Sequence, residues 1–82
     1  MNVIVYFRKI TASTSGDVQL TDLSRNGFQS RMGEILQFDQ LSLNDKKTIE
    51  GFNVETPSIL EVVFRELDVL DNCTNVILMV KN

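Results

Sequence analysis

The 82-residue chain begins and ends with short runs of apolar residues. Residues 3–7 read VIVYF and residues 76–80 read VILMV, so both runs consist of β-branched, aromatic and long aliphatic side chains. Short runs of this kind are typical of β-strands. The pattern therefore predicts a strand over residues 2–10 and a final strand over residues 75–81. The stretch TASTSGD at residues 11–17 has no apolar period and predicts a loop.

The first predicted helix follows that loop. Apolar residues recur three and four positions apart from Phe28 to Leu36, which is the spacing of one helix face. This spacing predicts a helix over about residues 28–37, with an extra turn before Asn26 left open. The Asn26-Gly27 pair is a strong breaker that sets the start of the main helix.

A second helix is predicted over residues 58–70. Ser58 and Glu61 have the spacing of a capping box, in which two side chains satisfy backbone N–H groups of the first helical turn. Pro57 precedes them, and proline is tolerated in the first turn of a helix. The expected buried stripe of this helix is Ile59, Val63, Leu67 and Leu70.

Residues 36–54 allow two interpretations. The first is a β-hairpin with its turn near Asn44 and Asp45, because both residue types suit turns. The second is a short helix within residues 42–52, capped by Ser42, with Asp45 at its third position. The hairpin is favoured because the apolar residues of this stretch do not share one helix face.

The resulting order is strand, helix, strand, strand, helix, strand. In one domain of residues 1–82, this order predicts an α+β fold, a ferredoxin-like βαββαβ sandwich. Its antiparallel sheet would carry two helices on one face. The likeness is one of element order alone and implies no function.

This architecture leaves one face of the sheet without helices. Side chains alternate between the two faces of a strand. If Val3, Val5 and Phe7 face the helices, the opposite face carries the other side chains of the two terminal strands. These are Ile4, Tyr6 and Arg8 in the first strand and Ile77 and Met79 in the last. A contiguous exposed apolar patch marks an interaction site. The alternative is that residues 11–27 fold back and bury this face within the chain.

The net charge of −3 lies entirely in the second half of the chain. Residues 1–41 carry four basic and four acidic side chains, whereas residues 42–82 carry four basic and seven acidic ones. This imbalance argues against a phosphate-binding surface as the main feature. Glu66 and Asp68 are candidates for an acidic partner-binding face on the second predicted helix.

The sequence offers no catalytic, cofactor-binding or metal-binding motif. It contains no histidine and one cysteine, Cys73, so neither a disulfide within the chain nor a Cys/His zinc site can form. The four glycines are too scattered for a phosphate-binding loop. No run approaches the length of a membrane span and no signal peptide is evident, so a cytoplasmic location is expected.

The functional hypothesis is therefore a small acidic protein that binds a macromolecular partner without catalysis. It would act as an inhibitor or adaptor on another protein, for example as a viral- or phage-type inhibitor of a host nucleic-acid-handling protein. A homodimer through the sheet face is a second form of the same hypothesis. The alternative function is weak binding of single-stranded nucleic acid, with bases stacked on Tyr6 and Phe52 of the sheet. The acidic charge argues against that alternative.

Overall fold

The computed structural model describes residues 2–10, 15–28, 30–52 and 57–81. The chain is α+β, with a five-stranded mixed sheet and two α-helices. In chain order the elements are β1 (Asn2–Ile10), β2 (Ser15–Gln19), α1 (Thr21–Arg25), β3 (Ile35–Gln37), a 3₁₀ helix (Phe38–Gln40), α2 (Leu43–Phe52), β4 (Ile59–Asp68) and β5 (Cys73–Val80).

The sheet differs from the predicted ferredoxin-like βαββαβ sandwich in strand number and order. Its strands lie in the order β2-β1-β5-β4-β3. The terminal strands β1 and β5 are parallel neighbours at its centre, and the other three pairings are antiparallel. Both apolar ends of the chain are therefore used for the central strands of the sheet.

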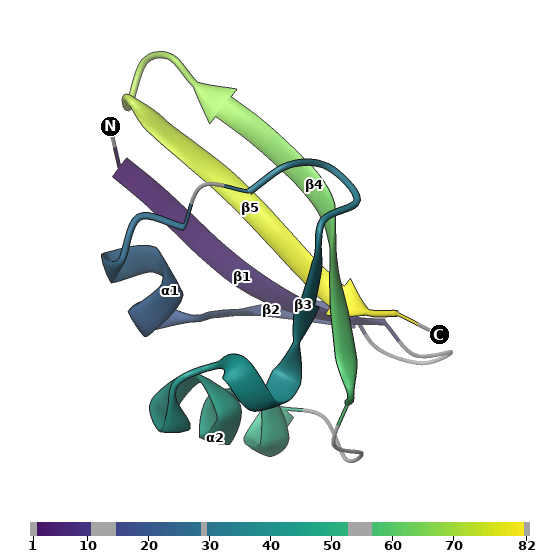
Figure 1. Ribbon diagram of the computed structural model, residues 1–82. Coiled ribbons are helices and arrows are strands. Elements are labelled where there is room, and N and C mark those ends of the chain that lie inside the picture. The colour runs from purple at the N-terminus through teal and green to yellow at the C-terminus, as the bar shows by residue number, and fades with distance from the viewer. Residues whose placement is uncertain (1, 11–14, 29, 53–56, 82) are drawn as a thin grey trace.

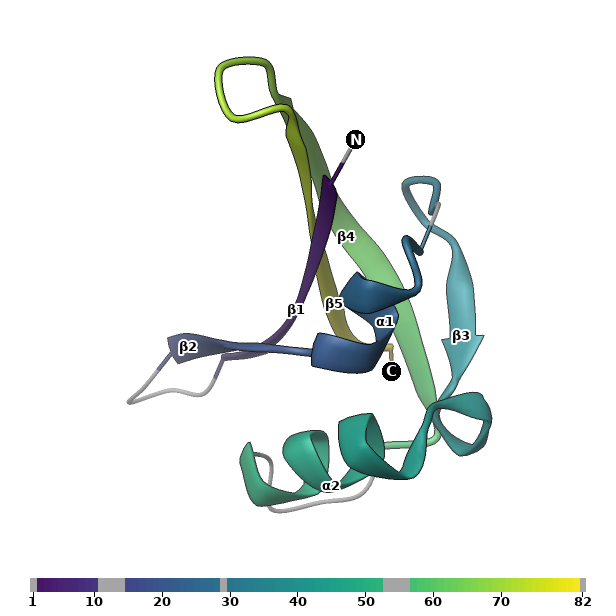
Figure 2. The same cartoon turned by 90° about the vertical axis from the view of Figure 1, so that its left-hand side faces the viewer.

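Both helices lie on one face of the twisted sheet, as Figures 1 and 2 show. The core lies between this face and the helices. Inward-facing residues of β1, β4 and β5 supply most of it, and Ile49 of α2 packs against them. Phe52 at the end of α2 makes an edge-to-face contact with Phe7 of β1, with ring centroids 6.3 Å apart. The members of the core that are less than 2% exposed include Val5, Phe7, Leu20, Ile49, Leu60, Val62, Val76 and Leu78.

A buried carboxylate joins the two helices. Asp45 of α2 is fully buried, and its two oxygens accept hydrogen bonds from the backbone N–H groups of Asp22 and Leu23 at 3.2 and 3.0 Å. These N–H groups belong to the first turn of α1, where Leu20 provides no side-chain cap. In return, the Ser42 hydroxyl donates to the Asp22 carboxylate at 2.6 Å. Asp45 thus satisfies two N–H groups at the start of α1, and Asp22 of α1 in turn holds Ser42, the residue that caps α2.

The predicted helix over residues 28–37 is wrong. Gly27 and Gly33 have φ values of 67° and 80°, in the left-handed region that a right-handed helix cannot contain. The helical turns lie earlier, in α1, and residues 35–37 form the edge strand β3. The apolar residues from Phe28 onwards therefore lie partly in the segment before β3, which bonds to Val62 of β4, and partly in β3 itself.

The predicted helix over residues 58–70 is also wrong, because this segment is the strand β4. Pro57 lies two residues before the first residue of the strand, where a missing backbone N–H removes no bond of the sheet. The register of β4 against β5 shifts between Val62 and Phe64, which marks a β-bulge at Val63. Thr56, which was expected to lie just before the helix, falls outside the described residues.

The favoured hairpin over residues 36–54 is wrong, because only residues 36–37 lie in a strand and the alternative helix forms as α2. Ser42 caps this helix as that alternative predicts, since its hydroxyl accepts the backbone N–H of Asp45 at 3.1 Å. Gly51 lies within the last turn of α2. Of the predicted loop over residues 11–17, positions 15–17 belong to β2 and positions 11–14 lie outside the described residues. No helix in the described parts of the chain is long and apolar enough to cross a membrane.

Candidate functional site

The face of the sheet opposite the helices, called the outer face below, is built from alternate residues of all five strands. Residues opposite each other in register project to the same face. Tyr6 of β1 is in register with Ile77 of β5, and Ile77 is in register with Phe64 of β4, so three apolar side chains form one row across the centre. The apolar members of the outer face are Ile4, Tyr6, Ile10, Ile35, Ile59, Phe64, Ile77 and Met79.

These side chains shield one another only in part. Ile77 lies in the central strand and is 6% exposed, although no helix covers it, because it lies between Tyr6 and Phe64. Ile4, Tyr6 and Met79 are half-buried, and Phe64 is 38% exposed. No described residue of segment 15–27 lies over this face, because β2 extends the sheet edge and α1 lies on the opposite side (Figures 1 and 2).

One end of the outer face carries two ion pairs. Arg8 of β1 binds Asp17 of β2 through two nitrogen–oxygen contacts of 2.8 and 3.0 Å. The hydrogen bonds from Arg8 lower the pKa of Asp17 below its ordinary value, and the same bonds raise the pKa of Arg8. Lys81 lies 3.6 Å from Glu61 of β4, with both side chains accessible to solvent. These ion pairs leave that end of the face electrically balanced.

The other end of the outer face is acidic. Because residues 59–68 form a strand and not a helix, Glu66 and Asp68 project to the outer face, in register with Asn75 and Cys73 of β5. No described residue forms an ion pair with either carboxylate. Asp71 in the following turn adds a third carboxylate, and its N–H group donates to Asp68 Oδ1 at 3.2 Å. The two separate surfaces considered from the sequence, an apolar sheet face and an acidic helix face, are therefore one continuous surface.

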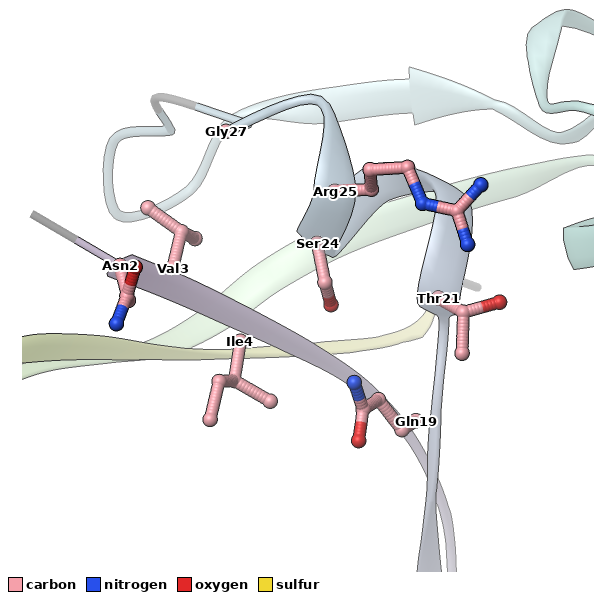
Figure 3. A pocket seen from close by; sticks show the side chains of 8 residues that line it. All are labelled: Asn2, Val3, Ile4, Gln19, Thr21, Ser24, Arg25 and Gly27. Atoms are coloured by element: carbon pink, nitrogen blue, oxygen red, sulfur yellow. The ribbon is translucent and has the colours of Figure 1, made fainter.

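A groove lies beside the outer face, where β2 leaves β1. It has a volume of about 510 Å³ and is lined by the first residues of β1, the end of β2, α1 and Gly27. Figure 3 shows Val3 pointing from β1 toward α1, and Ile4 projecting on the opposite side of the strand. Among the described residues of the lining, Arg25 is the only charged one.

Two residues considered for chemistry from the sequence are buried wholly or in part. Phe52 belongs to α2 and packs on Phe7, so it cannot stack a nucleic-acid base on the sheet as the alternative function required. Cys73 is a free, buried thiol with a long contact of 3.8 Å to the carbonyl oxygen of Thr74. Within the described residues, no group of three or more His, Cys, Asp or Glu side chains is placed to hold a metal ion.

Sequence reasoning missed four apolar members of the outer face: Ile10, Ile35, Ile59 and Phe64. Ile10 ends the predicted first strand but was not placed on a face, and the other three lie in segments that were assigned to helices. The alternation of Leu60 and Val62 was a signal for a strand, but the bulge at Val63 interrupts it after two repeats. The groove beside β1 had no signal in the sequence, because it depends on where β2 ends.

Comparison of the chain with protein-family models, with curated proteins and with solved structures found no match.

Proposed function

We propose that this protein binds a macromolecular partner through its outer face and acts without catalysis, as an inhibitor or adaptor. The observation that carries the proposal is the row of Tyr6, Ile77 and Phe64 on a face that no described segment covers. Four of the nine exposed large apolar side chains among the described residues also belong to this face. They are Ile10, Ile35, Ile59 and Phe64.

Exposed apolar surface of this kind favours association. Burying apolar area contributes roughly 25 cal/mol per Å², and monomers rarely expose contiguous patches above about 300–600 Å². Met79 adapts its shape to a partner, whereas Tyr6 contributes a rigid apolar ring with a polar tip. Residues that carry most of the binding energy lie at the centre of interfaces, where water is excluded. We therefore assign the central role to Tyr6, with Met79 in the neighbouring row of the same face.

The charges of the outer face define the kind of partner. Glu66 and Asp68 lie on one side of the apolar row without basic partners among the described residues, whereas Arg8 is already paired with Asp17. A partner with an apolar surface and a basic group beside it would complement both features. This pattern favours a protein over a nucleic acid, because the carboxylates repel phosphates. A second copy of the chain remains one form of such a protein partner.

The test is capture of partners by the tagged protein in cells of its source, with variants that change only the surface. Met79→Glu places a charge beside the apolar row, at the position in register with Glu61, and should reduce capture of the specific partner by at least about 30-fold. The matched control is Leu43→Glu on α2, which changes a side chain that is 65% exposed on the other side of the molecule.

A second pair of variants tests the acidic end. Glu66→Lys should weaken capture and reduce its dependence on salt concentration, while Glu50→Lys on α2 makes the same charge change without effect. Glu66 is the better site for reversal because Asp68 also holds the turn through its bond to Asp71. Equal capture by all four variants would contradict the proposal. Recovery of single-stranded RNA or DNA in place of protein would support the alternative function instead.

A further inference from the structure

The groove beside β1 lies where β1 extends beyond the end of its neighbour β2, so part of the β1 backbone has no adjacent strand on this side. Strand β2 ends at Gln19, and Leu20 is the last residue of that segment to bond to β1, through its N–H group to the Val5 carbonyl at 2.8 Å. Beyond this point the chain turns into α1. No described strand lies opposite Val3 on this side.

The direction of the Val3 backbone groups follows from its neighbours. The N–H group of Asn2 donates to the Asn72 carbonyl at 3.2 Å, on the β5 side of the strand. Backbone groups alternate in direction along a strand, so those of Val3 point to the other side, into the groove. The N–H group of Val5 points the same way, and there the Ser24 hydroxyl accepts it at 2.8 Å. At Val5, a side chain therefore takes the place of a strand partner for the N–H group. At Val3, the backbone N–H and C=O groups face the groove without a partner strand among the described residues.

The walls of the groove suit an extended peptide. Gln19 and Asn2 offer side-chain amides at its two ends, and Figure 3 shows Arg25 extending along α1 on the side facing solvent. Arg25 forms no ion pair with a described residue. Its charge is the only one among the described residues of the lining, and it favours a peptide that carries a carboxylate.

We infer that this groove binds an extended, acidic peptide segment, which pairs with Val3 as a short added strand and places a carboxylate near Arg25. Main-chain hydrogen bonds of this kind supply affinity that depends little on sequence, and the side chains of the groove supply preference. The outer edges of β2 and β3 also have no neighbouring strand among the described residues. This inference goes beyond the proposed function and does not require the outer face to bind anything.

The test is an NMR titration of the ¹⁵N-labelled protein with the capped peptide Ac-Thr-Val-Glu-Val-Thr-NH2 at millimolar concentrations. We expect amide shifts confined to residues 2–5 and 19–27. We also expect the Val3 amide to exchange rapidly with solvent in the free protein and slowly in the complex. The same peptide N-methylated at its three central residues keeps its side chains and charge but loses the backbone N–H donors of those residues. We expect that it does not bind.

Two variants examine the ionic contact. Arg25→Gln should weaken peptide binding by about threefold to tenfold, the range for a solvent-accessible charged contact. Lys47→Gln, the same change on the exposed surface of α2, should leave binding unaltered. The inference is overturned if the Val3 amide is protected in the free protein, if the N-methylated peptide binds equally well, or if shifts appear at the edge of β3 or nowhere. None of these outcomes bears on capture of a partner by the outer face.

Discussion

Asp45 is the residue on which the helical layer depends most. Its carboxylate is fully buried and accepts two backbone N–H groups of α1, and its own N–H group donates to Ser42. Helix α1 has five residues, too few to be stable alone, so its first turn depends on this contact from α2. Since α1 forms one wall of the groove, Asp45 also maintains the shape of that site.

The variant Asp45→Ala should lower the free energy of unfolding by about 2–3 kcal/mol, because it leaves two N–H groups at a helix start without partners. Urea denaturation followed by circular dichroism measures this loss. Glu50→Ala, at an exposed position of the same helix, serves as the control and should change stability by less than about 0.5 kcal/mol. Similar stability for both variants would show that the capping contact contributes little.

The ion pair between Arg8 and Asp17 gives the protein a specific response to acid. The pKa of Asp17 is lowered in the folded state by its hydrogen bonds to Arg8, from an ordinary value of 3.8. The folded state therefore binds the Asp17 proton less readily than the unfolded state does. Its contribution to stability is present above about pH 3.8 and is lost as the pH falls through the lowered pKa.

The variant Asp17→Asn should accordingly be slightly less stable than the wild type at neutral pH and equal to it in strong acid. Denaturation midpoints measured across this pH range give the comparison, with Asp39→Asn as the control at an exposed acidic position. A difference between Asp17→Asn and wild type that stays constant down to strong acid would contradict this account of the ion pair.

At the scale of elements, the strands at the two ends could be predicted and the central segments could not. Strands β1 and β5 lie inside the sheet, with the helices on one face and neighbouring apolar side chains on the other. Residues 3–7 and 76–80 are therefore apolar on both faces. Such runs have few other structures available to them. Their parallel pairing could not be predicted, because it joins residues that lie about seventy positions apart in the sequence.

The error over residues 58–70 has a local physical cause. A regular strand would keep its inward side chains two positions apart, as Leu60 and Val62 are. The bulge at Val63 adds one residue, and the inward positions after it are those of Arg65 and Leu67. The stripe of the predicted helix therefore combined Ile59 and Leu67, from opposite faces of β4, with Val63 at the bulge and Leu70 beyond the strand. Of the outer face, only the part in β1 and β5 could be predicted, because Phe64 and Glu66 join it only once β4 is a strand.

The turn between β4 and β5 supplies a prediction for this hairpin. Asn72 has a φ value of 51°, in the left-handed region where asparagine and glycine are the residues best tolerated. Asn72→Val should destabilise the protein by about 1–2 kcal/mol, whereas Asn72→Gly should be nearly neutral. Thermal unfolding of the two variants distinguishes them. Equal losses for both would mean that the asparagine side chain, and not the backbone conformation, determines the stability of the turn.

At the scale of the whole molecule, the arrangement separates stability from recognition. The helices and the core occupy one side of the sheet, and the apolar row and the carboxylates occupy the other (Figure 2). Changes at Met79 or Glu66 should therefore alter binding with little effect on folding. The groove at the edge of β1 adjoins the same surface through Ile4, so a single partner can contact both regions at once.

The most direct measurement of the central claim is site-specific photo-crosslinking in cells of the source, with a photoreactive phenylalanine at position 6 or position 43. Tyr6 lies in the centre of the outer face, and Leu43 lies on α2 with greater exposure to solvent. We expect a covalent adduct of defined mass from position 6 that is lost when Met79→Glu is added, and none from position 43. No adduct from position 6, or the same adducts from both positions, would contradict the claim that the outer face is the binding surface.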